Sequence, residues 1–425
     1  VGAGPAGLTC AEELRKRGFG DITIFGDFSA AQVRTENIDG VTADLAACYL
    51  HAGYWNTVAP LVREHGLRLR YLPPAQLVQA GLEPFRPTRA ERLRTAAQTA
   101  RFLRSSIRYL ATCRGESSRR YGVSLETFLA ERGLGALAHS FILGPGGVAQ
   151  GYGYLDRVAA HGALRWFRPS LFATALTQRF GRGTAVIVEG YGTLFRRILE
   201  KHRHDNRLVA RVHAGGRAAR PTLRLADGTE REFDQVIVAC PLTEVESPVS
   251  AAVRGGVEST RLFSVLWRSA QAPRFADRVY CMQQLRTKAY DRLLTFRSYG
   301  LSRRGDWIYW GVGYAEAEPF GGALAQIRGD FGHADAEVIE QRVFDYNLRF
   351  TAEAIARGAH LEVERRQGEG GVWYSGGLLS HWDIDAIAEH NRRLGRRLAH
   401  RLTPPRGWAR VGAALEAVRL AAEDC

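Results

Sequence analysis

VGAGPAGL, at residues 1–8, determines the fold, because Gly2, Gly4 and Gly7 match the pattern G-x-G-x-x-G. In dinucleotide-binding βαβ units the first glycine allows a tight turn and the second lets the backbone approach a pyrophosphate. The third lets the following helix pack closely against the strand, and free amides at the start of that helix face the phosphates. The context agrees, since a helix-like segment follows and Asp21–Phe25 is typical of a second strand. The stretch therefore predicts a dinucleotide-binding domain.

The residue that should hold the ribose is displaced. An acidic side chain normally ends the second strand, roughly 20 residues after the glycines. Gly26 occupies that place here, and the nearest acid is Asp27. Asp27 reaches the ribose if the strand runs one residue longer; alternatively, it is a solvated turn residue. Both interpretations stay open at this point.

Composition limits the class of protein. A chain of 425 residues with 45% hydrophobic content is long enough for two or three packed domains. No apolar run approaches about 18 residues, so we expect no membrane span. The net charge of +14 comes almost wholly from scattered arginines, without a dense basic run interleaved with aromatics. We therefore expect no nucleic-acid partner, whereas an anionic substrate, a carrier protein or a partner enzyme fits the charge.

The six cysteines are widely spaced, and no C-x-x-C motif or His/Cys cluster at metal-binding spacing occurs. We therefore expect no metal site. Scattered thiols and the lack of a visible signal peptide favour a reducing, cytoplasmic location. The sequence begins without Met and inside a motif, so a targeting segment upstream stays open.

The remaining patterns give the order of elements. Apolar residues recur at helical spacing in several segments, and other segments have the composition of strands. The helices are expected at Ala90–Cys113, Leu125–Arg132, Ala334–Ala356 and Ile384–Leu402. Phe233–Cys240 is typical of a buried parallel strand, and the alternation over 255–315 predicts an antiparallel sheet. The order indicates an α/β protein.

Separated segments resemble one family. They are VGAGPAGL, Val188–His202, Leu223–Leu242 and Val372–Leu394, with a further likeness at Gly151–Trp166. The chain resembles FAD-dependent flavin amine oxidases and their relatives, the phytoene-desaturase-like and protoporphyrinogen-oxidase-like enzymes. It is most similar to the bacterial polyunsaturated fatty acid double-bond isomerase branch. The resemblance implies an FAD/NAD(P)-binding Rossmann-like domain joined to a substrate domain of mixed sheet and helices.

The resemblance also implies domain boundaries and a cofactor site. The FAD-binding domain would be discontinuous, over 1–72, 184–250 and 366–425, and the substrate-binding domain would span 73–183 and 251–365. In this arrangement the ribbon near Val209 and the strand end at Cys240 lie on the adenine side. The implied FAD contacts are Gly2, Gly4, Pro5, Ala6, Gly7, Asp27, Val209, Cys240, Gly376, Gly377, Asp383 and Ile384.

Departures from the family pattern leave FAD retention open. The family has Glu at the end of the second strand and a Gly-Gly pair soon after it, where this chain has Gly26 and Ala30-Ala31. Near the C-terminus the family's Ala-Gly-Glu becomes Ser-Gly-Gly, so Gly377 replaces an acid. A Cβ on each alanine would crowd the backbone's approach to a phosphate. Either FAD still binds through the glycine loop and the last helix, or the chain kept the fold and lost the flavin.

Few protein acids or bases are needed when a flavin carries the hydride. His381 is a candidate general acid or base; alternatively, it packs at the domain junction. Tyr152 and Tyr154 are candidates for lining the substrate tunnel or donating a proton, or else they are core tyrosines. Asp383 is a good N-cap for the last helix. Arg165 and Arg168 are candidates for holding a carboxylate.

Three functions follow. The first is an FAD-dependent oxidoreductase or isomerase that acts on a hydrophobic, unsaturated small molecule by hydride transfer to the flavin, through desaturation, oxidation or double-bond migration. The second is a relative without flavin that performs cyclisation, isomerisation or dehydration. The third is a non-catalytic partner in a biosynthetic pathway. A role in bacterial secondary metabolism fits each of them, and the oligomeric state stays open.

Overall fold

The computed structural model describes residues 1–51, 57–113, 115–138, 151–166, 183–216, 219–274, 278–283, 288–381 and 383–402. The expectation for Arg168, and the part of the predicted FAD-binding domain after residue 402, lie outside these residues.

A parallel layer forms around the first residues of the chain. β1 (Thr23–Phe25) pairs in parallel with β8 (Arg203–Asp205), and β12 (Val236–Val238) pairs in parallel with β18 (Val372–Tyr374). The opening residues join the two pairs, because the Gly2 amide donates to the Phe25 carbonyl at 2.8 Å and the Ala239 amide donates to the Val1 carbonyl at 2.7 Å. The layer confirms the predicted βαβ start, and also the buried parallel strand that leads to Cys240.

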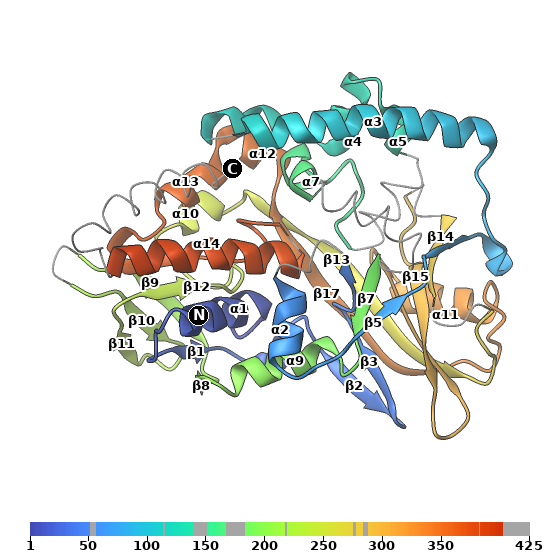
Figure 1. Cartoon of the computed structure of the whole chain (residues 1–425), viewed down its shortest axis with the longest axis horizontal. Helices are drawn as coiled ribbons and strands as arrows, with labels where there is room; N and C mark the ends of the chain where they lie inside the picture. The colour runs from blue at the N-terminus through green and yellow to red at the C-terminus, as the bar shows by residue number, and fades with distance from the viewer. Residues whose placement is uncertain are drawn as a thin grey trace.

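The first and last described helices lie side by side over this layer (Figure 1). They are α1 (Pro5–Lys16) and α14 (Ile384–Leu402). The side-chain amide of Asn391 donates to the Ala6 carbonyl and to Thr9 Oγ1, each at 2.8 Å. Asn391 is fully buried, so these bonds fix the C-terminal helix against the glycine loop.

Smaller elements complete this half of the molecule. The helices α2 (Val58–Glu64) and α9 (Tyr191–Leu199) pack against the parallel layer, and a three-stranded antiparallel ribbon extends from it. The ribbon strands are β9 (Val209–His213), β10 (Thr222–Leu225) and β11 (Glu230–Glu232). The remaining strands here are β2 (Thr35–Ile38), β3 (Val41–Asp44), β4 (Leu50–His51), β5 (Leu69–Leu72) and β7 (Thr184–Ile187).

A six-stranded mixed sheet forms the other half of the molecule, in the order β17-β13-β16-β15-β14-β6. Only β14 and β6 pair in parallel within it. The strands are β6 (Gln76–Val78), β13 (Val257–Ser269), β14 (Val279–Met282), β15 (Leu293–Leu301), β16 (Trp307–Tyr314) and β17 (Glu337–Phe350). The antiparallel pairings of β13 with β16, of β15 with β16 and of β14 with β15 confirm the antiparallel sheet predicted over 255–315. In its core the rings of Trp267 and Tyr309 stack with centroids 5.4 Å apart.

The helix predicted over Ala334–Ala356 is wrong for most of its length. β17 fills residues 337–350 and pairs with β13, and only the short α12 (Ala352–Arg357) follows it. Exposed Gln341, Val343 and Asp345 alternate with more buried neighbours, which is the period of a strand. The pairing with the central strand β13 therefore determines the structure of this segment.

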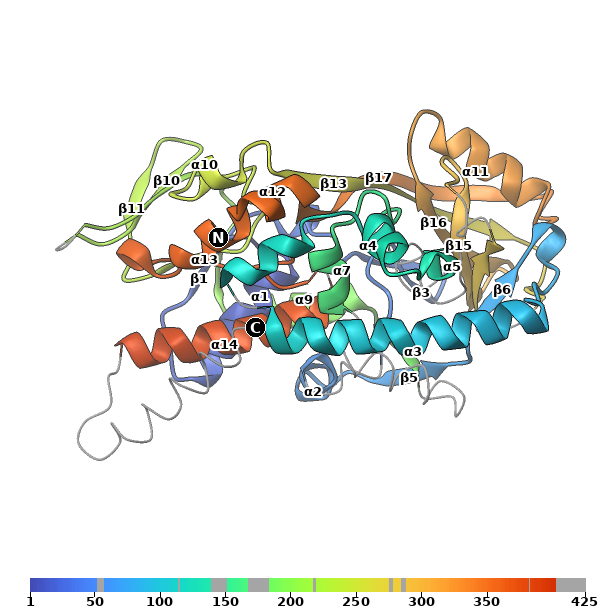
Figure 2. The ribbon, with the colours of Figure 1, turned by 90° about the horizontal axis from the view of Figure 1, so that it is seen from above.

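Helices cover one side of the sheet. Figure 2 shows α3 (Arg89–Thr112) running lengthwise along this side, with α4 (Leu125–Glu131) and α7 (Ala160–Trp166) between α3 and the strands β13 and β17. The 3-10 helix η4 (Gly115–Tyr121) follows α3 in the chain. The short helices α5 (Gly135–Ala138), α10 (Ser250–Val253), α11 (Pro319–Arg328) and α13 (Ala359–Arg365) complete the structure. Thr88 and Glu91 form a capping box at the start of α3, which confirms this predicted helix. Among the described residues, no helix is long and apolar enough to cross a membrane.

We propose that the two domains follow the predicted boundaries. β5 ends at Leu72 and pairs with β7, which starts at Thr184, so these segments belong to one body. β6, just after Pro74, joins the six-stranded sheet instead. The return of β18 and α14 to the parallel layer supports assigning the last segment to the FAD-binding domain.

Candidate cofactor groove and active site

A groove with a volume of about 400 Å³ opens beside the start of α1. Its walls come from segments that are far apart in the sequence: the glycine loop, the end of β1, the segment after β12, and the segment from β18 into α14. Nine of the predicted cofactor residues line the groove: Gly2, Gly4, Pro5, Ala6, Asp27, Cys240, Gly376, Gly377 and Ile384.

The three glycines of the motif have different local roles. Gly2 has a φ of +113°, and a Cβ there would lie 2.8 Å from the backbone of Ala239. A Cβ on Gly7 would lie 1.9 Å from the Gly2 carbonyl oxygen, so Gly7 permits the close packing of α1. A Cβ on Gly4 would meet no atom within 4 Å, because Gly4 borders the groove. No described side chain caps α1, which leaves its first amides and its positive dipole end for an anion.

Asp27 lines the groove, and its side chain also caps η1 (Phe28–Ala30). Its carboxylate accepts hydrogen bonds from the Ser29 amide at 2.8 Å and the Ser29 hydroxyl at 2.7 Å. These bonds lower the pKa of Asp27. Asp27 therefore has the turn role that the sequence left open. Its side chain is also exposed, so the carboxylate remains accessible from the groove.

The departures from the family pattern have local explanations. Gly26 has a φ of +125°, and a Cβ there would lie 3.4 Å from the Ala3 nitrogen; a glutamate would be strained in this backbone. Ala31 lines the groove in an ordinary extended conformation, with φ −65° and ψ 142°. It therefore needs no positive φ, and its Cβ narrows the groove without backbone strain.

The charge of the groove differs from that of the whole chain. Among the described lining residues there is no Lys or Arg, whereas Asp27, Glu244 and Asp345 line it. Burial, followed by repulsion from Asp345, raises the pKa of Glu244. A diphosphate in this groove would thus be held by backbone amides and the helix dipole, without a neutralising side chain. The glycine loop fits a diphosphate in shape and in its donors.

Gly7, Val209 and Asp383 do not line the groove. Val209 is buried in β9, and its exposed neighbour Leu208 lines the groove instead. Asp383 caps α14, since its carboxylate Oδ1 accepts from the Ala386 amide at 2.6 Å. The N-cap role predicted for Asp383 is confirmed.

His381 and Tyr152 lie together, and Tyr154 has other contacts. The rings of His381 and Tyr152 meet edge to face with centroids 5.1 Å apart, and His381 Nδ1 lies 2.9 Å from Asp383 Oδ2. Burial raises the pKa of Tyr152 well above its usual value, so its phenol stays protonated. The hydroxyl of Tyr154 accepts from the Ala289 amide at 2.7 Å and donates to the same residue's carbonyl. These bonds attach Tyr154 to the backbone and favour a structural role.

A second cavity, with a volume of about 520 Å³, lies beyond the loop that ends the groove. Gly377 and Leu378 line both spaces, whereas His381 lines only the second one. We call this space the histidine cavity, because His161, His360 and His381 line it. Sequence reasoning missed His161 and His360, since their neighbourhood arises only from tertiary packing and no spacing connects them. No group of described His, Cys, Asp and Glu residues is arranged to hold a metal ion.

A family profile for flavin containing amine oxidoreductases matches residues 5–265. The chain belongs to this family. The match begins just after Gly2 and Gly4, and it includes Gly7, α1, the strands β1, β8 and β12 of the parallel layer, and most of β13. As a member of the flavin containing amine oxidoreductases, the protein is an enzyme of the oxidoreductase type. No curated protein matches the sequence.

Solved structures show that this family member has the family's fold. A CLA-producing fatty acid isomerase from P. acnes is similar at a TM-score of 0.75 and 18% identity, over 93% of this chain and 97% of that one. Wild-type putrescine oxidase bound to putrescine is similar at a TM-score of 0.67 and 14% identity, over 94% of this chain and 97% of that one. Cyclohexylamine oxidase from Brevibacterium oxydans IH-35A is similar at a TM-score of 0.65 and 13% identity, over 94% of this chain and 98% of that one. These likenesses confirm the predicted fold class, an FAD-binding domain with a mixed-sheet substrate domain.

Proposed function

We propose that the chain retains FAD in the groove and acts on a hydrophobic, unsaturated small molecule, by desaturation, oxidation or double-bond migration. The open groove beside the glycine loop supports this proposal most directly. Gly2, Gly4 and Gly7 keep the conformation and the clearance that a bound diphosphate requires. The structural likeness to a fatty acid isomerase favours an unsaturated substrate.

FAD, when bound, supplies the hydride chemistry. The chain's own residues position it and manage protons. The start of α14, at Ile384, lines the groove with its positive dipole end, which favours negative charge nearby. His381, held by Asp383 and in ring contact with Tyr152, is placed to hold or move a proton at an imidazole nitrogen.

A flavin-free enzyme of the same fold is the second candidate. One observation favours it: no described Lys or Arg lines the groove, although a diphosphate carries negative charge. Such a protein would use His381 and Tyr152 for non-redox chemistry such as isomerisation or dehydration.

The first prediction separates the two candidates. Freshly purified protein should be yellow, with absorbance in the near ultraviolet and the blue. Denaturation should release FAD in about one equivalent per chain, because a tightly bound flavin survives purification. Absorbance spectroscopy and chromatography of the released ligand measure this. A colourless protein whose melting temperature does not change on adding FAD would favour the flavin-free candidate.

The cysteines support a location for this activity. The five described cysteines are free thiols, and Cys10, Cys48, Cys113 and Cys281 are buried. Free thiols are typical of reducing compartments, so we propose a cytoplasmic enzyme.

A further inference from the structure

We propose that a small cavity on the sheet face covered by α11 is a second ligand site, and that it binds a neutral compound with one ring and one carbonyl group. The described residues that line it line neither the groove nor the histidine cavity. The cavity lies beside the end of α11, and Figures 1 and 2 both place α11 far from α1 and the groove. The proposal therefore does not rest on FAD retention.

The alternation of side chains across the sheet separates this cavity from the nucleotide half of the molecule. Trp267 of β13 and Tyr309 of β16 pair in register, and both pack in one core with Ile327 of α11. Their chain neighbours Leu266 and Ile308 belong to the core of the opposite face, which also contains β3. Successive side chains of a strand point to opposite faces, so the cavity is formed behind the sheet.

The volume of the cavity limits the ligand to about one ring. It is about 170 Å³, whereas the sites of drug-sized ligands measure roughly 300–1,000 Å³. An apolar cavity of about 150 Å³ is known to hold one benzene molecule. A single ring with a short substituent therefore fits, and a molecule with two rings does not.

Stacked aromatic side chains form much of the wall. The ring centroids of Tyr280 and Phe296 lie 4.4 Å apart, and those of Phe296 and Phe331 lie 4.2 Å apart. The Tyr309 ring lies 4.5 Å from that of His333. Rings that already pack on one another lose little freedom when a ligand binds, and they favour contact with a further ring.

One N–H donor belongs to this wall, and its tautomer is determined by a neighbour. The indole Nε1–H of Trp267 donates to His333 Nδ1 at 3.1 Å. Because an indole N–H can only donate, Nδ1 is the unprotonated nitrogen of the ring and Nε2 carries the hydrogen. Burial lowers the pKa of His333 to about 4, so the imidazole keeps this neutral form near pH 7.

The Nε2–H group of His333 is available to a ligand. His333 is 3% exposed and lines the cavity. Its Nε2 has no hydrogen-bond partner among the described residues, yet it keeps accessible surface, unlike the sealed Nε2 atoms of His65 and His202. The neighbouring Tyr309 hydroxyl donates instead to the Gln271 carbonyl at 2.6 Å. An acceptor atom on a ligand in the cavity would satisfy the Nε2–H donor.

The charges near the cavity favour a neutral ligand. Arg274 at the rim pairs with Glu83 at 2.7 Å, and the Asp335 carboxylate accepts from the Ser269 hydroxyl at 2.7 Å. The negative charge of Asp335 also acts on His333, so it would repel an anion beside Nε2. A cation would meet a hydrogen-bond donor there. A carbonyl oxygen accepts a hydrogen bond without carrying a full charge, so it fits this position.

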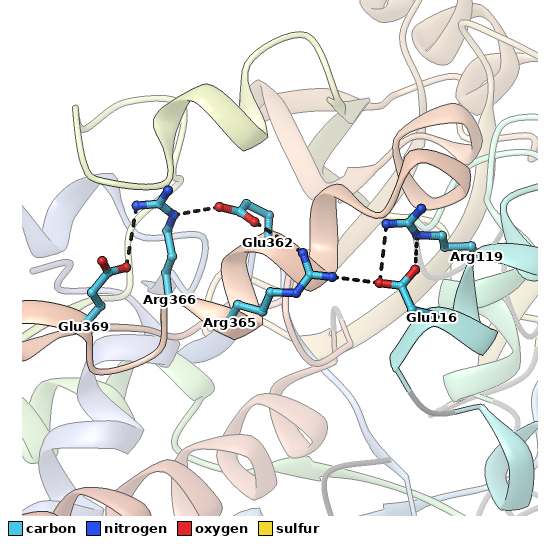
Figure 3. A network of polar contacts seen from close by, with 6 residues as sticks. All are labelled: Glu116, Arg119, Glu362, Arg365, Arg366 and Glu369. Atoms are coloured by element: carbon cyan, nitrogen blue, oxygen red, sulfur yellow. Dashed lines mark hydrogen bonds and ion pairs between the residues drawn. The ribbon is translucent and has the colours of Figure 1, made fainter.

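Polar groups at the surface of α13 show the contrast. Figure 3 shows a network in which Arg365 pairs with Glu116 at 2.7 Å and Arg366 pairs with Glu362 at 2.8 Å. These charged groups satisfy one another and are also partly open to water, so they do not need a ligand. His333 differs because its donor is enclosed by aromatic side chains and meets no described acceptor.

The experiment is a calorimetric titration of the full-length chain with acetophenone, which has one ring and one carbonyl oxygen. Acetophenone should bind saturably. Ethylbenzene, which has a similar shape but no acceptor, should bind severalfold more weakly. Benzoate, which is charged, and 4-acetylbiphenyl, which has a second ring, should each bind at least tenfold more weakly than acetophenone.

Two pairs of variants locate the site. His333→Asn puts an amide oxygen near the position of Nδ1, so Trp267 keeps an acceptor while Nε2–H is lost, and the preference for acetophenone over ethylbenzene should disappear. His333→Gln puts an amide N–H near the position of Nε2 and should keep part of that preference. Phe331→Trp fills part of the cavity and should weaken both ligands at least tenfold. The matched Phe320→Trp, outside the cavity lining, should leave both affinities unchanged.

The proposal is overturned if acetophenone does not saturate, which would mean that the cavity holds water only, or if ethylbenzene binds equally well. It is also overturned if the preference survives His333→Asn, or if Phe331→Trp changes neither affinity. If circular dichroism shows that His333→Asn does not fold, the ligand series on the wild type and the two Phe variants decide. Acetophenone should bind whether the protein is yellow or colourless, which separates this proposal from the proposed function.

Discussion

Gly7→Ala should lower the free energy of unfolding by about 3 kcal/mol, the upper end of what overpacking costs. A Cβ on Gly7 would lie 1.9 Å from the Gly2 carbonyl oxygen. Relief requires α1 to move away from the parallel layer, and that movement would break the bonds from Asn391 to α1. The variant should therefore also lose bound flavin. Urea denaturation followed by circular dichroism measures the change in stability.

Gly4→Ala is the matched variant in the same loop. Gly4 has a φ of −84°, which alanine adopts readily, and its Cβ would meet no atom within 4 Å. Its stability should change by less than about 1 kcal/mol, the cost of alanine at a helix N-cap. Flavin content should fall at least tenfold, because the new methyl group stands where a diphosphate approaches. Equal destabilisation by the two variants, or unchanged flavin content in Gly4→Ala, would contradict this account of the loop.

Stability should fall by at least about 4 kcal/mol between pH 7 and pH 5, since buried His161, whose pKa burial also lowers, adds to the histidines named next. Burial lowers the pKa of His390 to about 3 and those of His333 and His360 to about 4. Each stays neutral in the fold, whereas its unfolded form binds a proton below about pH 6.5. Because the unfolded state then holds more protons, each histidine removes about 2 kcal/mol by pH 5. Burial raises the pKa of Asp44 to about 7, and its protonation in the fold opposes this loss by about 2 kcal/mol.

Urea midpoints at pH 7, 6 and 5 measure this effect. His390→Phe should reduce the fall by about 2 kcal/mol, because it removes one buried titrating group. His213→Gln, at an exposed position, should leave the fall unchanged. A stability that is constant or rises as the pH drops to 5 would refute the assignment of neutral buried histidines.

The sequence predicted those parts of the fold in which local and tertiary preferences agree. The glycine loop, the strand that ends at Phe25 and the helix Ile384–Leu402 all follow from local patterns, and the structure has each of them. β17 was missed because its residues also suit a helix, and only pairing with the central strand β13 determines the outcome. Strand propensity depends strongly on such context.

The sequence predicted much of the groove beside the glycine loop but none of the histidine cavity's neighbourhood. The groove is built around a continuous glycine motif, and most residues expected to contact a cofactor line it. The histidine cavity joins His161 of α7, His360 of α13 and Ser118 of η4. Its members share no spacing, so their proximity becomes visible only once β17 carries α13 back to η4. Single histidines in a sequence give no sign of such a meeting.

The pairing of α1 with α14 has a consequence for biosynthesis. Asn391 bonds to Ala6, a residue 385 positions earlier in the chain. Nascent chains usually fold domain by domain as they leave the ribosome, but here the amino-terminal helix emerges long before its partner is translated. The apolar surface of α1 must wait, exposed or shielded by a chaperone, until α14 has been translated. Premature termination ahead of α14 would thus leave α1 without its native neighbour.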